Sequence, residues 1–362
     1  MKITHVEAFR VAVPPADPPF RWRDGLSGSP ATGDGAVLRI GTDAGAEGVA
    51  FLSRPGAWAV LSYLAENVFR PELLGADPLQ REWLWHRVWE LDRIHELPLY
   101  VLGLVDTALW DLAGRVQGEP VWRLLGGFRT EIPAYASTST FADIPEFLDV
   151  ADQALALGYR GVKLHAWGDA RRDAELALAL REHVGDAVPL MYDGSAGFDL
   201  PDAIRLGDAL ADAGYLWYEE PMREFSVGAY AALARSVRIS LLVGETSDGA
   251  HFDSADFIRA GAATFGVRTS TNLRGGITGA MRTAHLADSF LLRAEVHGSD
   301  IPTHHLCMAI SNTTYYESLV TSHPVRREPA VDADGMLHAP TTPGIALPAG
   351  LEYPADLERF AA

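Results

Sequence analysis

The chain has 362 residues, 48% hydrophobic and 22% charged, which is typical of a globular protein large enough for a barrel and a smaller domain. Its 48 acidic residues outnumber its 30 Lys and Arg residues, and the formal net charge of −18 argues against nucleic acid or an anionic membrane as a partner. No apolar run approaches the roughly 20 residues that span a bilayer. The single cysteine, Cys307, excludes an internal disulfide framework and favours a cytoplasmic location.

The first 125 residues predict an α+β domain. Alternating apolar residues indicate strands at Lys2–Val13 and Gly35–Ile40, on either side of a loop rich in Pro, Gly and Ser at Pro14–Gly33. A second loop of this kind follows at Ser53–Gly56. Helical periodicity then predicts helices at Ala57–Phe69, Leu79–Leu91 and Leu102–Val116.

Residues 126–325 alternate between strand and helix patterns, which predicts a parallel barrel. A strand is expected at Ile132–Ser137, and Asp143 with Glu146 has the spacing of a helix capping box. The tail, residues 326–362, loses this rhythm and is expected to pack back on the first domain. The other expected elements are strands at Gly161–His165, Thr264–Arg268 and Leu291–His297, helices at Ala174–His183 and Ile277–Ala287, and a helix started by Pro201.

Three carboxylates, Asp193, Glu219 and Glu245, end short apolar runs and are spaced 26 residues apart twice over. One strand, one helix and two loops fill such an interval, so each acid is expected at the carboxyl end of successive barrel strands. Three converging acids would repel one another unless a cation lay among them, and an all-oxygen site suits Mg²⁺. A helix cap or a surface pair would explain any one of these acids alone. Glu220 could replace Glu219 as the ligand, but we favour Glu219.

Proton-transfer groups are predicted beside these acids. Lys163 and His165 are two residues apart on an expected strand, so both side chains would point into the same barrel mouth. His297 ends a later strand and would lie across that mouth. Two such groups on opposite sides of a metal-bound substrate could remove and deliver protons on opposite faces. The alternative is that Lys163 extends to solvent and that the two histidines only make structural hydrogen bonds at the ends of their strands.

Three other polar residues follow His297. His304 and His305 come after Pro-Thr and are predicted to lie on a loop, where one could contact substrate. Glu317 ends the run Tyr-Tyr-Glu, and the local sequence indicates no more than a solvated acid.

The chain resembles the enolase superfamily, of the mandelate racemase/muconate lactonizing enzyme type, over nearly its whole length. The resemblance implies an α/β fold, a modified (β/α)₇β TIM-type barrel with an N-terminal α+β capping domain. It also implies one Mg²⁺ per subunit, held by the three acids, and removal of the proton α to a substrate carboxylate through a metal-stabilised enediolate. The matching residues are Ala108–Gly114 with Pro120, Leu124-Leu-Gly-Gly127, Lys163-Leu-His165, Asp193, Trp217-Tyr-Glu219-Glu-Pro, Gly244-Glu245 and Gly275-Gly-Ile-Thr-Gly279.

The resemblance implies roles for individual residues. Lys163 would help to neutralise the enediolate, and His165 and His297 would serve its two faces. Glu317 falls where racemase-like members place an acid that hydrogen-bonds the enediolate. The two loops of the first domain would close over the mouth and select the substrate. The candidate substrate contacts are Arg21, Trp22, Arg54, Ser195 and His305.

Three positions depart from the family pattern. His165 stands where the second lysine of a Lys-x-Lys motif is usual, and Ser195 stands where an Asn is frequent. Ser270 stands where racemase-like members place an Asp that orients the catalytic histidine. Without that carboxylate, His297 is expected to be less strongly held as an imidazolium, which disfavours a two-base racemisation.

The leading hypothesis is therefore dehydration of a sugar acid to a 2-keto-3-deoxy acid, because elimination needs an acid at the leaving group more than a second strong base. Racemisation, epimerisation or cycloisomerisation of a carboxylic acid is the alternative. A hypothesis of another class is a barrel that binds a metal or ligand without turnover. A metal-dependent hydrolase is disfavoured because such sites usually include histidine ligands. The expected partners are a small-molecule carboxylate and further copies of the chain in a homo-oligomer.

Overall fold

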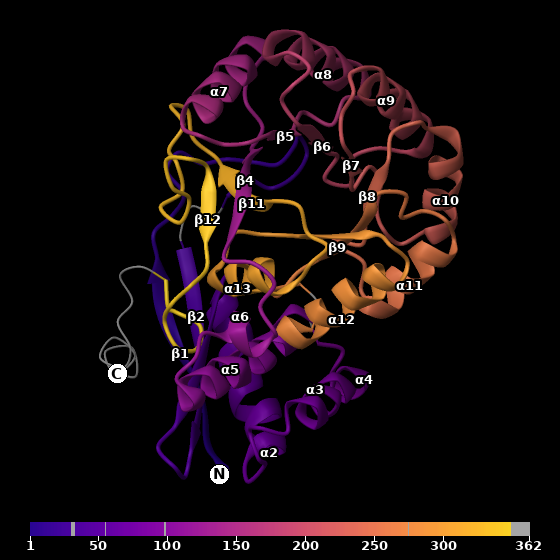
Figure 1. The fold of residues 1–362 in the computed structure, drawn as a ribbon. Helices are drawn as coiled ribbons and strands as arrows, with labels where there is room; N and C mark the ends of the chain where they lie inside the picture. Colours follow the sequence, from indigo (N-terminus) through magenta and orange to yellow (C-terminus); the bar gives the residue numbers. More distant parts are fainter. Residues whose placement is uncertain (30–32, 55, 98, 274, 349–362) are drawn as a thin grey trace.

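The structure is a computed structural model that describes residues 1–29, 33–54, 56–97, 99–273 and 275–348. A capping domain from the N-terminal part of the chain lies against one end of a larger unit with a curled parallel sheet and an outer layer of helices (Figure 1). The predicted fold class is confirmed. Within the described residues, no helix combines the length and apolar character needed to cross a membrane.

The capping domain contains an antiparallel sheet in the order β1-β2-β3. Its strands are β1 (Ile3–Val13), β2 (Gly33–Thr42) and β3 (Glu47–Ser53). The first two were predicted. The sequence does not reveal β3 because consecutive residues Gly48, Val49 and Ala50 are all buried, so polar and apolar residues do not alternate. The helices are α1 (Ala57–Leu64), the π-helical turn η1 (Ala65–Phe69), α2 (Arg70–Leu73), α3 (Arg81–Glu90), α4 (Asp92–His95), α5 (Leu99–Gln117) and α6 (Val121–Leu124).

The barrel sheet is parallel in the order β10-β9-β8-β7-β6-β5-β4-β11, and β12 pairs antiparallel with β4. The alternation of short strands and helices that the sequence indicates is therefore present. The strands are β4 (Glu131–Thr138), β5 (Val162–His165), β6 (Leu190–Asp193), β7 (Tyr218–Glu219), β8 (Leu241–Val243), β9 (Gly266–Thr269), β10 (Arg293–Val296), β11 (Tyr316–Val320) and β12 (Met336–His338). The helices are α7 (Ile144–Ala156), α8 (Ala170–Val184), α9 (Leu200–Asp212), α10 (Val227–Ser236), α11 (His251–Arg259), α12 (Gly276–Ser289) and α13 (Ile301–Ala309).

Local signals account for several helix starts. Asp143 caps α7 by accepting a hydrogen bond from the Glu146 backbone N–H at 3.0 Å, as its sequence spacing predicts. Pro201 lies in the first turn of α9, where the missing N–H costs no helical hydrogen bond. Apolar residues of these helices pack on the outer face of the sheet, while Tyr135, Met191 and Trp217 form part of a separate apolar cluster with Leu242.

Strand register brings the predicted acids together. His165 is the register partner of Asp193 between β5 and β6, and Asp193 is the partner of Glu219 between β6 and β7. Glu245 follows the end of β8 by two residues. The carboxyl ends of neighbouring parallel strands therefore deliver these side chains to one edge of the sheet.

The barrel wall has a seam between β10 and β11, because in the described chain no backbone ladder joins these strands. Three N–H groups of the β10 segment face the seam. Ala294 N–H donates to the Asn312 carbonyl at 2.9 Å, and Val296 N–H donates to Thr313 Oγ1 at 3.4 Å. Gly298 N–H donates to Glu317 Oε2 at 2.9 Å. Side chains therefore supply two of these three acceptors.

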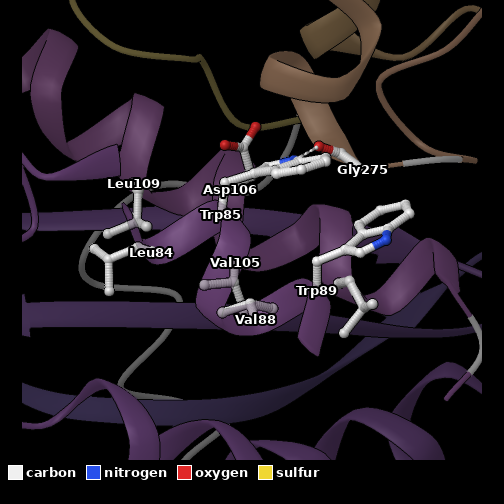
Figure 2. Close-up of a pocket in the computed structure, with 9 residues that line it drawn as sticks. Leu84, Trp85, Val88, Trp89, Val105, Asp106, Leu109 and Gly275 are labelled. Carbon is white, nitrogen blue, oxygen red and sulfur yellow. Dashed lines mark hydrogen bonds between the residues drawn. The ribbon is translucent and has the colours of Figure 1, made fainter. Parts of the chain in front are cut away.

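The capping domain is joined to the start of α12 through buried polar contacts (Figure 2). Trp85 Nε1 donates to the Gly275 carbonyl at 2.7 Å. Asp106 accepts from both the backbone N–H and the hydroxyl of Thr278, at 2.8 and 2.6 Å. Burial raises the pKa of Asp106 to about 7. Gly276 has a φ of 69°, and a Cβ there would lie 2.6 Å from Asp106 Oδ2, so this close approach requires glycine.

The tail divides between the two domains. β12 pairs with β4, so this part of the tail packs on the barrel and not on the capping domain, where it was predicted. Further on, the Ile345 backbone N–H donates to Asp111 Oδ1 at 2.5 Å, and Leu347 packs against an apolar cluster of the cap sheet. Residues 349–362, with residues 30–32 and 55 of the two predicted loops, lie outside the described residues.

Candidate metal and catalytic site

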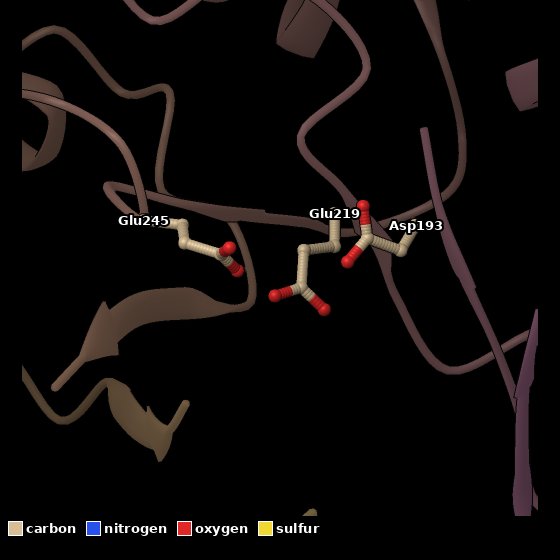
Figure 3. Close-up of side chains that lie close together, drawn as sticks. All are labelled: Asp193, Glu219 and Glu245. Carbon is tan, nitrogen blue, oxygen red and sulfur yellow. The ribbon is translucent and has the colours of Figure 1, made fainter. Parts of the chain in front are cut away.

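Asp193, Glu219 and Glu245, which we call the acid triad, converge at the carboxyl edge of the barrel (Figure 3). One carboxylate oxygen from each lies within 4.8 Å of the others. Asp193 and Glu219 are buried, and the Glu245 side chain is 11% exposed. The strand-end spacing of the sequence thus produces the predicted cluster.

The donor set fits a hard divalent cation. Glu245 Oε2 is a buried carboxylate oxygen with no well-aligned hydrogen-bond donor among the described residues, although His297 Nδ1 lies 3.1 Å away. Burial raises the pKa of Glu219 to about 8, although Arg268 and Lys163 act in the opposite direction. Ionisation of Glu219 beside the other two acids is therefore favoured by further positive charge. Oxygen ligands of this kind are those that Mg²⁺ prefers.

Glu224 holds the segment that carries Glu245. Its carboxylate accepts hydrogen bonds from the backbone N–H groups of Gly244, Thr246 and Ser247, the last two at 2.6 and 3.1 Å. Glu224 is 6% exposed, so these bonds are largely shielded from water. Sequence reasoning missed Glu224, because no local pattern distinguishes it from a surface acid.

Lys163 is surrounded by carboxylates. Its Nζ lies 3.1 Å from Asp193 Oδ2, 2.9 Å from Glu219 Oε2 and 2.7 Å from Glu317 Oε1. Burial lowers the pKa of Lys163, as Arg268 does, but Glu219 and Glu317 outweigh them and hold the pKa well above its ordinary value. Lys163 is therefore an ammonium group, suited to stabilising negative charge and unsuited to acting as a base.

His165 is held from both sides of its ring. Its Nδ1 lies 2.7 Å from the Thr138 carbonyl, which can only accept, so Nδ1 carries the proton. Its Nε2 then faces Asp193 Oδ2 at 3.0 Å. The Trp22 ring, from the capping domain, lies over it with centroids 4.7 Å apart. With Nδ1 protonated, Nε2 is the ring nitrogen that gains or loses a proton, and when protonated it can donate to Asp193 Oδ2.

His297 lies near two acids. Its Nδ1 is 3.1 Å from Glu245 Oε2 and 3.5 Å from Glu317 Oε2. Burial lowers the pKa of His297, but Glu245 outweighs burial and raises the pKa above its ordinary value. Ser270 Oγ accepts from the backbone N–H groups of Asn272 and Leu273, at 3.1 and 3.2 Å. Ser270 therefore stabilises its own turn. Glu245 and Glu317 stand beside His297 in place of the missing Asp, so the expectation that His297 is less strongly held as an imidazolium is wrong.

Glu317 is not the solvated acid that its local sequence indicates. It lies on β11 with 2% exposure and contacts Lys163, Arg268 and the Gly298 backbone N–H. Arg268, on β9, is also 2% exposed and contacts Glu219. Sequence reasoning missed Arg268, because both of its carboxylate partners lie far away in the sequence.

A cavity of about 500 Å³ opens at this site. Arg54 and Arg223 have no carboxylate partner within the described chain, although the Arg54 guanidinium lies 5.3 Å from the centre of the Tyr100 ring. Phe225, which is 78% exposed, also reaches the cavity. The predicted residues that line the cavity are Trp22, Arg54, His165, Asp193, Ser195, Glu245, His297 and Glu317.

Two predicted substrate contacts lie elsewhere. Arg21 pairs with Asp24 at 2.9 Å and is not among the cavity-lining residues. His305 is fully buried on α13, where its Nδ1 accepts from the Trp122 backbone N–H at 3.1 Å. The expected loop at His304 and His305 is wrong because Pro-Thr lies in the first turn of a helix capped by Asp300.

The loop that carries Trp22 is docked on the barrel mouth. Arg23 Nε donates to the Ser195 carbonyl at 2.9 Å, and the Asp24 backbone N–H donates to the Trp167 carbonyl at 3.2 Å. The Ser195 N–H in turn donates to Asp193 Oδ1 at 2.8 Å. Backbone groups of Ser195 thus connect the capping loop to the first acid of the triad.

Similar proteins and structures span nearly the whole chain. The 3,6-anhydro-alpha-L-galactonate cycloisomerase of Streptomyces coelicolor is 30% identical over 335 residues, covering 90% of this chain and 92% of that protein. The crystal structure of D-glucarate dehydratase from Agrobacterium tumefaciens complexed with magnesium is 32% identical, with a TM-score of 0.84 and 95% of both chains covered. The crystal structure of a racemase from Streptomyces coelicolor with bound magnesium is 29% identical, with a TM-score of 0.82 and 99% of both chains covered.

The family matches agree with this architecture. Residues 7–126 match the family described as Mandelate racemase / muconate lactonizing enzyme, N-terminal domain. Residues 146–349 match the family described as Enolase C-terminal domain-like. The chain belongs to the mandelate racemase/muconate lactonizing enzyme family of the enolase superfamily.

Proposed function

We propose that the chain removes the proton α to a substrate carboxylate with the help of Mg²⁺ and then eliminates water from a sugar acid, giving a 2-keto-3-deoxy acid. The observation that carries the proposal is the order of groups around the cavity. His165 ends β5 and His297 directly follows β10, so they stand at the two ends of an arc of strands, and the acid triad lies at the ends of strands between them. Magnesium-bound structures of similar chains support the choice of metal.

The acid triad would hold Mg²⁺, which when bound would withdraw charge from the substrate carboxylate and acidify its α-proton. Lys163 would add a positive charge at this point, because Glu219 and Glu317 raise its pKa well above the ordinary value. His165 would then be the base, through Nε2, since its Nδ1 proton is committed to Thr138.

His297 would deliver a proton to the departing β-hydroxyl. Elimination needs an acid here, and the neighbouring Glu245 and Glu317 favour a protonated imidazole. Arg54 and Arg223, which have no carboxylate partner in the described chain, would bind anionic or hydroxyl groups at the far end of the substrate.

The test is incubation of the Mg²⁺-loaded protein with aldonic and aldaric acids in D₂O. Keto acid, trapped by semicarbazide, is expected for at least one of them. With that acid, H297N should lose about 10²- to 10⁴-fold in keto-acid formation but still exchange the α-proton. H165N should lose both, and H285N, at an exposed histidine on α12, should lose neither.

Other outcomes would contradict the proposal. Solvent deuterium at the α-carbon without loss of water would favour racemisation or cycloisomerisation. Cycloisomerisation is the activity named for the relative that is 30% identical. Absence of any turnover over the whole panel, with Mg²⁺ bound, would favour a ligand-binding barrel.

A further inference from the structure

Four buried side chains of alternating charge form a closed ring across the barrel. Lys163 Nζ lies 2.9 Å from Glu219 Oε2 and 2.7 Å from Glu317 Oε1. On the opposite wall, Arg268 Nε contacts Glu219 Oε1, and its Nη2 lies 3.1 Å from Glu317 Oε2. Each of the four residues is at most 2% exposed. We call this set the charge ring.

Arg268 is fixed within the ring by further bonds. Its Nη1 donates to the Val296 carbonyl at 2.9 Å, and its Nη2 donates to the Tyr135 hydroxyl at 3.1 Å. Arginine does not give up its proton inside proteins, so this is a permanent positive charge. Because Arg268 does not line the large cavity, it can act on a substrate only through its neighbours.

Arg268 contributes one of the positive charges packed around the acid triad and Glu317. The acid triad and Glu317 contribute four negative charges. Lys163 and Arg268 contribute two positive charges, and a divalent cation contributes two more. Without Arg268, this set of groups would be one charge unit more negative towards a carboxylate substrate, whose deprotonation adds another negative charge.

We propose that Arg268 is a positioning residue whose positive charge weakens metal binding at Glu219 and strengthens binding of an anionic substrate at the metal-loaded centre. This inference rests on the proposed metal-dependent function. It has opposite effects on two ligands, which a purely structural role would not produce. Loss of Arg268 would also free the Glu219 side chain, which would then have to be ordered when the metal binds. The entropic cost of ordering one side chain is smaller than the electrostatic effect of one unit charge beside Glu219.

The test measures Mg²⁺ binding by calorimetry, then binding of oxalate to the Mg²⁺-loaded protein as a probe for a small dianion. R268M should bind Mg²⁺ about tenfold more tightly and oxalate about tenfold more weakly than the unsubstituted chain. E317Q, which removes a negative charge from the same ring, should shift both affinities in the opposite direction. R238M, at an exposed arginine, should shift neither.

A double variant keeps the test informative if R268M does not fold. R268M/E317Q removes one charge of each sign, so its melting temperature should exceed that of either single variant. The difference in Mg²⁺ affinity between the double variant and E317Q then measures the effect of losing Arg268. Unchanged or weaker Mg²⁺ binding on loss of Arg268 would overturn the inference. Failure of the unsubstituted chain to bind Mg²⁺ would instead overturn the proposed function.

Discussion

The buried carboxyl of Asp106 at the joint between cap and barrel predicts a specific pH dependence of stability. Burial raises its pKa from 3.8 to about 7, so the folded chain holds this proton at pH values where the unfolded chain has released it. Stability from this group is fully present below about pH 4 and is lost as the pH rises through 7. With about 1.4 kcal/mol per pKa unit, the loss between pH 5 and pH 8 is about 3 kcal/mol.

Asp106→Asn isolates this effect from all other titrations. The amide can accept from the Thr278 N–H and donate to its hydroxyl oxygen, so the site stays filled. The free energy of unfolding is measured by urea titration at several pH values. The difference between D106N and the unsubstituted chain should shift by about 3 kcal/mol in favour of D106N from pH 5 to pH 8.

The control is D288N, at an exposed acid of α12. It removes one negative charge from the helix that Asp106 contacts, without touching the joint, so its stability should follow that of the unsubstituted chain. If the curves for D106N and the unsubstituted chain also stayed parallel from pH 5 to pH 8, the buried acid would not be titrating and the reasoning would be refuted.

Three further predictions concern the site. Mg²⁺ at about 100 times its Kd should stabilise the chain by about 2.7 kcal/mol, which raises the melting temperature of a chain of 362 residues by about 3–4 °C. E245Q should lose this shift in melting temperature, and an equal shift in E245Q would exclude Glu245 as a metal ligand. Trp22→Leu removes the ring over His165 and should lower kcat/KM about tenfold with Mg²⁺ affinity unchanged; a change confined to Mg²⁺ affinity would contradict this. Arg54→Met should raise KM about tenfold with kcat nearly unchanged in steady-state kinetics, and an unaltered KM would remove Arg54 from the substrate site.

The acid triad could be predicted because its signal is local and repeated. Each acid ends an apolar strand, and equal spacing in a strand–helix alternation puts successive acids on neighbouring strands. His165 could be placed for a related reason, since a period of two puts it on the same side as Lys163.

Residues whose roles depend on distant partners could not be found in this way. Arg268 contacts Glu219 and Glu317, each 49 residues away, and the sequence around it resembles any polar strand. Glu224 holds backbone groups that lie 20 to 23 residues further on. The prediction of a loop at His305 is wrong because Pro-Thr is compatible both with a loop and with the first turn of a helix, where it lies here.

The seam between β10 and β11 affects how the catalytic groups can move. His297 and Glu317 lie on opposite sides of it, so no backbone ladder fixes their separation, and side-chain bonds from Thr313, Glu317 and Arg268 do so instead. Such bonds can break singly, whereas a ladder opens cooperatively. Amide hydrogens of β10 that face the seam should therefore exchange with solvent sooner than those of β5, whose two neighbours are both laddered. Local opening along this seam would pass between His297, the proposed acid, and Glu317, the carboxylate beside it.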